Sequence, residues 1–192
     1  MTIFEHLSVF VSIILGLAVV HLLGGVSLIL DARVKTEVYW VHLLWTANML
    51  FLIVLVWLGN FVLAPAVTFS AVHFLNLIAY AMVIYLMSGL LYPVQGEEVT
   101  DFRRHFHANR VRFCSLGILF VLTDALDGVL EHRATQIPLN PGQYLTLAVW
   151  FVLFGLGIRR SGERVHGAAA VLFMLGLLGF LESLVRYGVV AP

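Results

Sequence analysis

Long runs of apolar residues constrain this chain more than any other feature, because very few folds can keep such runs away from water. A helix needs about 20 predominantly apolar residues to cross the hydrocarbon core of a bilayer, with a range of about 17–25. Six stretches approach or exceed this length: 3–30, 38–63, 69–92, 108–130, 143–158 and 165–188. The sequence therefore predicts an all-α polytopic membrane helix bundle of six transmembrane helices, forming one integral membrane domain over residues 1–192.

The composition supports a lipid bilayer as the partner that covers this apolar surface. Of the 192 residues, 61% are hydrophobic and 11% are charged, whereas a soluble domain has about 45–50% apolar and about 25% charged residues. A chain of this size cannot bury so much apolar surface within itself. The formal net charge is zero and no basic segment is interleaved with aromatic residues, so no nucleic-acid partner is expected.

Basic residues predict how the chain is oriented in its membrane. The first, third and fifth loops carry most of them: Arg33, Lys35, Arg103, Arg104, Arg159, Arg160 and Arg164. Because Lys and Arg are enriched in cytoplasmic loops, we expect both termini on the extracytoplasmic side of a multi-pass protein of the cell inner membrane. The first apolar stretch is longer than the apolar region of a cleavable signal peptide, so we expect it to be retained as a helix.

The third loop has the pattern of a short amphipathic helix at about residues 97–107. Val99, Phe102 and Phe106 share one helical face. Acidic residues come early in this segment and basic residues come late, which suits the dipole of a helix. We expect this helix to lie on the cytoplasmic surface of the membrane as an interfacial helix.

Ionisable side chains inside the predicted helices mark the candidate site, because such groups are costly in a bilayer and need a compensating role. Asp124, Asp127 and Glu131 lie at positions i, i+3 and i+7 and share a face of the fourth helix. In the predicted topology, ionisable groups of other helices lie near the same extracytoplasmic end. We expect six of them to meet in one polar cavity that binds an ion or protons: Asp124, Asp127, Glu182, Glu5, His73 and Arg186.

The charge balance of this cavity suggests a function. Four carboxylates against one arginine cannot all stay ionised in a dry site, so water, bound protons or a cation must compensate them. The first hypothesis is a channel or transporter for protons or a small cation, or an outward-facing ion-binding bundle. Asp124 and Asp127 would bind or relay the ion. Glu182 and Arg186 have a simpler alternative, because residues four apart can form an ion pair within one helix.

Carboxylates and imidazoles also bind metals, which gives a second hypothesis. His73, Asp124, Asp127 and Glu5 would hold a divalent metal that activates water in an intramembrane metalloenzyme. The sequence has no HExxH or GxSxG motif, the local patterns that mark zinc proteases and serine hydrolases. An enzyme is therefore not the favoured interpretation, and the first hypothesis needs no cofactor.

Haem is the weakest of the cofactor hypotheses. His21 and His42 lie in the inner halves of the first two helices, where two facing imidazoles would ligate a b-type haem. No two histidines have the HxxxH spacing of ligands on one helix. His42 also lies near the start of its helix, where an ordinary interfacial histidine is expected.

Small residues support a third hypothesis, a non-catalytic membrane scaffold or signalling partner. Gly24-Gly25 and Gly155-Leu156-Gly157 lie within predicted helices, and a further small-residue run covers 167–170. Small side chains let membrane helices approach closely. Such contacts would form within the chain or between the subunits of a homo-oligomer.

Four stretches of the chain carry a resemblance to known proteins. They are residues 4–8 (FEHLS), 12–23, 39–45 (YWVHLLW) and 106–113. Together they resemble a family of small bacterial inner-membrane proteins with six helices. The resemblance implies a six-helix fold and a bacterial inner membrane, and it carries no activity over to this chain.

Overall fold

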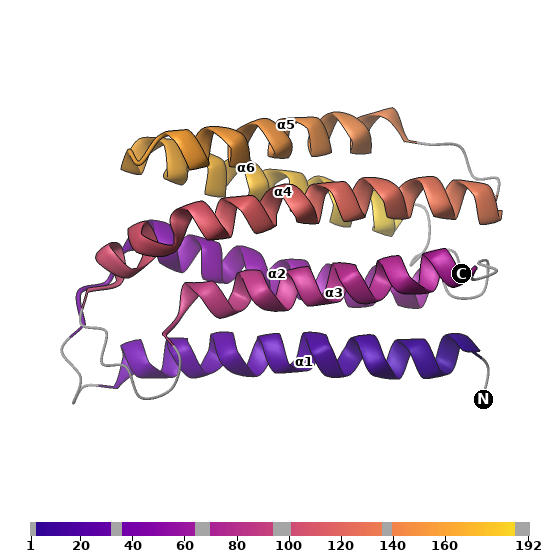
Figure 1. Ribbon diagram of the computed structural model, residues 1–192, viewed down its shortest axis with the longest axis horizontal. Helices are drawn as coiled ribbons and strands as arrows, with labels where there is room; N and C mark the ends of the chain where they lie inside the picture. Colours follow the sequence, from indigo (N-terminus) through magenta and orange to yellow (C-terminus); the bar gives the residue numbers. More distant parts are fainter. Residues whose placement is uncertain (1–2, 32–35, 64–69, 94–100, 136–139, 187–192) are drawn as a thin grey trace.

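A computed structural model describes residues 3–31, 36–63, 70–93, 101–135 and 140–186. Six helices account for nearly all of these residues (Figure 1): α1 Ile3–Leu30, α2 Trp40–Leu63, α3 Ala71–Leu91, α4 Phe102–Thr135, α5 Pro141–Arg159 and α6 Glu163–Leu184. Each helix is long and apolar enough to cross a membrane. The prediction of an all-α, multi-pass membrane protein is confirmed.

Local capping signals explain where two of the helices begin. The Oδ1 atom of Asn140 accepts a hydrogen bond from the Gly142 N–H at 2.9 Å, and Pro141 occupies the first turn of α5. A proline suits this position because its missing N–H would have no partner within the helix. The Ser70 hydroxyl caps α3 in the same way by accepting from the His73 N–H at 3.2 Å. Because of its cap, the fifth helix begins two residues before the predicted start.

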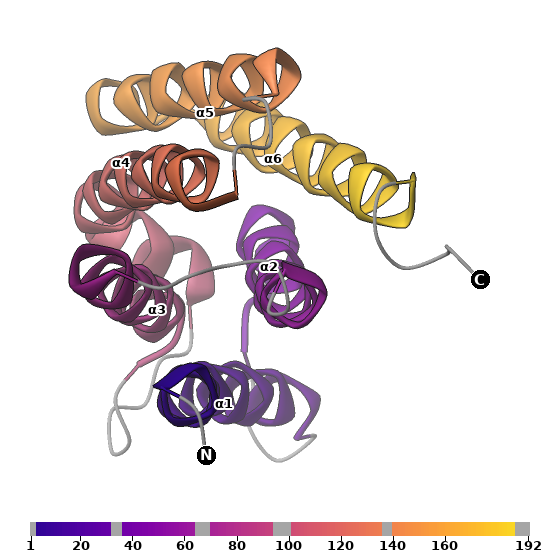
Figure 2. The same cartoon turned by 90° about the vertical axis from the view of Figure 1, so that its right-hand side faces the viewer.

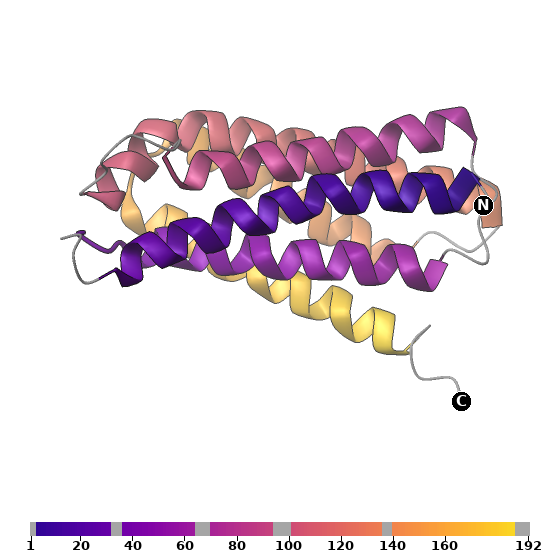
Figure 3. The same cartoon turned by 90° about the horizontal axis from the view of Figure 1, so that it is seen from below.

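The helices form an antiparallel bundle in which α1 lies at one side. Helix α1 packs against α2 and α3, α4 lies between α3 and α5, and α6 contacts α2 and α5 (Figure 2). Helix α1 begins and α6 ends at the same end of the bundle, called the termini end below (Figure 1). The opposite end, where α4 begins, is called the basic end. Figure 3 shows α6 running obliquely to the other helices and diverging from them toward the termini end.

The separate interfacial helix predicted at 97–107 is wrong over the residues that the structure describes. Residues 102–107 are the first turns of α4, a single helix of 34 residues. No proline or glycine interrupts the chain from 102 to 116. Phe102 and Phe106 are buried inside the bundle rather than facing lipid headgroups, which fixes this segment to the rest of α4. Residues 97–100 lie outside the described residues.

An aromatic cluster fills the half of the bundle nearer the basic end. Trp45 of α2 is buried and contacts one ring from each of three other helices. Its ring centroid lies 4.9 Å from that of Phe113 on α4, 5.7 Å from Phe154 on α5 and 5.4 Å from Phe173 on α6. These rings pack α2, α4, α5 and α6 together.

Polar contacts join three helix starts at the basic end. Glu163, in the first turn of α6, accepts a hydrogen bond from Trp40 Nε1 at 2.6 Å and pairs with Arg103 at 3.0 Å. The backbone N–H of Phe102 donates to the Glu37 carbonyl at 3.2 Å. Because Trp40 begins α2 and Arg103 lies in the first turn of α4, these contacts fix the basic end of the bundle.

Candidate functional site

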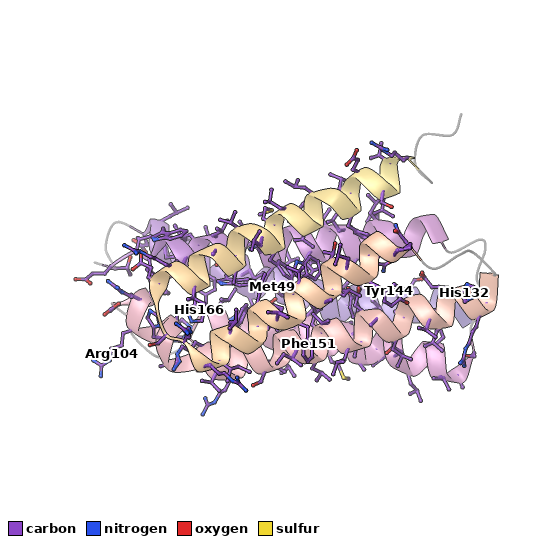
Figure 4. All side chains as sticks on the ribbon, turned by 90° about the horizontal axis from the view of Figure 1, so that it is seen from above. Met49, Arg104, His132, Tyr144, Phe151 and His166 are labelled. Atoms are coloured by element: carbon purple, nitrogen blue, oxygen red, sulfur yellow. The ribbon has the colours of Figure 1, made fainter. Side chains whose placement is uncertain are left out.

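Three carboxylates on one face of α4 line a cavity of about 430 Å³. Asp124, Asp127 and Glu131 are spaced three and four residues apart, which places them on the same side of a helix. The cavity is enclosed mainly by α2, α4, α5 and α6, with two side chains from α3, and all its lining residues lie in the half of the bundle nearer the termini end. Tyr144 and His132, labelled in Figure 4, lie toward this end, whereas His166 lies at the other end.

Asp124 is held by a tyrosine of the neighbouring helix. The hydroxyl of Tyr80 on α3 donates a hydrogen bond to Asp124 Oδ1 at 2.8 Å. Tyr80 is buried and its ring stacks on Phe120, one turn before Asp124 on α4, with 5.3 Å between the centroids. A hydrogen bond from a fixed donor partly replaces the water that the carboxylate has lost.

Asp127 has two buried partners on α3. His73 Nε2 lies 3.2 Å from Asp127 Oδ1, and the Asn76 side-chain amide donates to the same oxygen at 3.2 Å. The Asn76 amide also donates to the Thr123 carbonyl at 3.1 Å. Because Ser70 caps the helix at the His73 N–H, the start of α3 positions the imidazole that meets Asp127. The predicted neighbourhood of His73, Asp124 and Asp127 is therefore present.

The carboxylates also act on one another through space. Asp124, Asp127 and Glu131 line the same cavity from successive turns of α4, so their carboxylates repel one another when they are ionised. Like charges in a medium of low dielectric constant repel more strongly than in water. The site therefore contains a tyrosine hydroxyl, an imidazole, an amide and three acids. The three acids together attract a positively charged ligand.

Glycine brings α5 close to the acidic face of α4. A Cβ atom at Gly128 would lie 2.9 Å from the hydroxyl oxygen of Tyr144. That hydroxyl donates to the Ala125 carbonyl at 3.4 Å. With Gly128 in place, α5 can present Asn140 and Gln143 to the cavity near the termini end.

The walls opposite α4 are apolar and aromatic. Helix α2 and helix α6 contribute mainly aliphatic side chains and glycine, together with Phe180. Phe120 of α4 and Trp150 of α5 line the cavity farther from the termini end, and their ring centroids lie 6.0 Å apart. The sequence did not predict these walls, because which helices lie side by side cannot be read from the periodicity of any single helix.

Three of the predicted site residues whose side chains the structure describes do not line the cavity. One of them is His73, which contacts Asp127 from α3. Glu182 and Arg186 form an ion pair within one helix, as the simpler alternative supposed, and their side chains are 62% and 72% exposed. Neither residue lines the cavity. Glu182 faces outward because α6 turns its glycine and Ser183 side toward the interior at this level. The structure therefore does not bring this pair together with Asp124 and Asp127.

Glu5 cannot be placed relative to the cavity, because its side chain lies outside the described part of the structure. Its helix, α1, packs against α2 and α3. The cavity lining comes from the other five helices. The predicted role of Glu5 therefore stays a prediction.

His21 and His42 both contact the ring of Tyr92. The centroid of His42 lies 4.7 Å from that of Tyr92, and the centroid of His21 lies 6.4 Å from it. His42 Nε2 is 2.7 Å from the Leu91 carbonyl oxygen, so it must carry the proton and donate. His42 also stacks on Phe102 at 4.9 Å. These contacts give His42 a packing role between α2, α3 and α4.

The structure brings two of the four predicted metal ligands into contact with each other, His73 and Asp127. Among the residues that the structure describes, no group of three or more His, Cys, Asp or Glu side chains is arranged to hold a metal ion. Asp124 uses one oxygen to accept from Tyr80.

The site geometry and the six spanning helices define a multi-pass membrane protein with an acidic cavity between its helices. Comparisons with protein-family models, with curated proteins and with solved structures find no match. The family resemblance suggested by the sequence accordingly has no support beyond the six helices themselves.

Proposed function

We propose that this protein binds a cation in the acidic cavity and carries it through the membrane, as a transporter or channel for protons or small cations. The observation that carries the proposal is the placement of Asp124, Asp127 and Glu131 on one face of a spanning helix, lining a cavity. Ionisable residues in a spanning segment are costly and commonly mark an ion pathway. A bound cation would compensate the three acids.

The hydrogen-bond partners support a binding role for these acids. Tyr80 and Asn76 donate to Asp124 and Asp127, which orients the carboxylates while leaving their remaining lone pairs for a ligand. His73 Nε2 lies 3.2 Å from Asp127 Oδ1, so an imidazole also helps to fix the position of this carboxylate.

The shape of the bundle suggests how transport would proceed. The cavity lies in the termini half, and the buried aromatic cluster around Trp45 fills the basic half. A cation that enters the cavity would need the aromatic cluster to open before it reached the other side. In the predicted orientation, the cavity faces the extracytoplasmic side, so binding would occur from outside the cell.

Reconstitution into liposomes tests the proposal. Liposomes that contain the wild-type protein and a trapped pH-sensitive dye should take up protons, or should take up radioactive sodium or rubidium, faster than empty liposomes. The double variant Asp124→Asn, Asp127→Asn should lose most of this uptake, because neutral amides cannot compensate a cation. Glu182→Gln is the matched control, since Glu182 is exposed and does not line the cavity.

The proposal is contradicted if the wild type and the double variant take up all three of these cations at the same rates. Metal analysis of protein purified without chelator distinguishes this proposal from the alternative, an intramembrane metalloenzyme. Stoichiometric metal that disappears in the double variant would point to the metalloprotein instead. Size-exclusion chromatography in detergent checks that the variants are folded.

A further inference from the structure

The cavity is much larger than a single inorganic ion needs. Its volume is about 430 Å³, whereas one water molecule occupies about 30 Å³ of liquid. Cavities that hold small organic ligands fall in the range of about 300–1,000 Å³. If the ligand were a metal ion or a proton, water would fill most of this volume. That water would contact the apolar walls, which is unfavourable.

The lining is divided into an acidic side and an apolar side. Asp124, Asp127 and Glu131 come from α4, whereas α2 and α6 contribute mainly aliphatic residues and glycine. Four aromatic residues also line the cavity: Tyr80, Phe120, Trp150 and Phe180. Aromatic faces attract cations, and the attraction grows when water is excluded. This division matches a ligand that carries a positive charge on an apolar body.

One residue of the lining, Trp150, also has a buried donor without a partner among the described residues. Trp150 lines the cavity but is only 6% exposed, and its Nε1–H has no hydrogen-bond partner in the described part of the chain. A buried N–H without an acceptor is costly. A rotation of the indole that turned Nε1 toward the cavity would let an oxygen atom of a bound molecule supply the missing acceptor.

The position of α6 gives such a molecule a way in. Leu175 and Phe180 line the cavity and are also 56% and 38% exposed at the surface of the bundle. Gly179, between them, has nothing within 4 Å of the place where a Cβ would be. Helix α6 diverges from the other helices at this end (Figure 3), and these exposed lining residues would give a molecule dissolved in the bilayer a route to the cavity.

We infer that the cation taken by this cavity is a small organic cation with an apolar or aromatic body, its positive charge lying against Asp124 and Asp127. The inference rests on the proposed function and names the class of its ligand. The ammonium group replaces the missing counter-charge of the acids, and the body covers the apolar walls of α2, α5 and α6. Neutral molecules of the same shape leave the carboxylates uncompensated and therefore bind weakly.

Binding of berberine to the full-length protein in nanodiscs tests the inference. Berberine is a flat aromatic quaternary ammonium ion with ether oxygens, and its fluorescence increases in an apolar site. The wild-type protein should bind it saturably, and the uncharged reduced form, dihydroberberine, should compete poorly. Asp124→Asn, Asp127→Asn should weaken binding by about thirtyfold or more, the factor expected for loss of a buried charge pair.

Two glycine variants test the location without changing any charge. Gly179 lines the cavity and has room for a side chain, so Gly179→Leu should narrow the cavity and remove measurable berberine binding. Gly16→Leu is the matched control, because Gly16 is exposed on α1 and a Cβ added there would also meet nothing within 4 Å. It should bind berberine like the wild type. The competition experiment uses wild-type protein, so it decides the inference even where a variant fails to fold.

The outcomes separate this inference from the proposed function. If berberine fails to bind, or binds equally to the wild type and to both cavity variants, the inference is overturned. Liposome uptake of protons, sodium or rubidium that still depends on Asp124 and Asp127 would then leave the proposed function standing. If neither berberine binding nor small-cation uptake depends on these two residues, both proposals fail.

Discussion

Tyr80 fixes the orientation of the Asp124 carboxylate more directly than any other residue described at the site. Its hydroxyl donates to Asp124 at 2.8 Å, and its ring is held by Phe120. A carboxylate between membrane helices has few other sources of hydrogen bonds. Tyr80 therefore positions the acid for a ligand and also lowers the cost of burying it.

Removing the Tyr80 hydroxyl should destabilise the protein. We expect Tyr80→Phe to lower the free energy of unfolding by about 1–3 kcal/mol, because a hydrogen bond to a charged or buried acceptor is lost while the ring remains. The measurement is thermal unfolding in detergent. Tyr85→Phe, on an exposed position of the same helix, is the control and should unfold like the wild type; equal stability of all three proteins would show that the hydroxyl is unimportant.

Glycine determines how closely α4 and α5 pack. A Cβ at Gly117 of α4 would lie 2.4 Å from the ring of Phe154 on α5, far inside normal contact. Phe154 is part of the aromatic cluster and stacks on Trp45. The cluster that closes the basic half therefore requires a residue without a side chain at position 117.

A methyl group at this position should disturb the cluster. We expect Gly117→Ala to lower the free energy of unfolding by about 1–3 kcal/mol through overpacking. Gly155→Ala is the matched control, because nothing lies within 4 Å of a Cβ at Gly155, and its stability should stay the same or rise slightly. Thermal unfolding of both variants checks this, and similar melting temperatures would contradict the role given to Gly117.

The sequence predicted most of the fold, because its strongest signals are local to each helix. Apolar length located all six helices, and helical spacing put Asp124 and Asp127 on one face, as the cavity lining has them. The interfacial helix was wrong because amphipathic spacing at Phe102 and Phe106 fits burial against other helices as well as burial in lipid. Glu182 was expected in the cavity but does not line it, because spacing shows that Glu182 and Arg186 share a face of α6 and does not show which face of α6 turns inward.

At the scale of the whole molecule, the two halves of the bundle differ in packing. Aromatic rings from four helices fill the basic half, where Glu163 also joins the starts of α2, α4 and α6. The termini half contains the cavity, and there α6 diverges from its neighbours (Figure 3). A binding site that is accessible from only one side of a membrane requires a bundle that is closed in one half and open in the other. Which side this is remains a prediction from the basic loops.

The central claim, that the carboxylates of α4 bind a cation in the cavity, can be measured at the acids themselves. Dicyclohexylcarbodiimide enters membranes and modifies protonated carboxyl groups, and mass spectrometry locates the modified residue. We predict modification of Asp124 or Asp127 that decreases as a cation such as tetraphenylphosphonium, sodium or berberine is added, while any modification of the exposed Glu182 does not change. Modification of Asp124 and Asp127 that no added cation reduces would contradict the account.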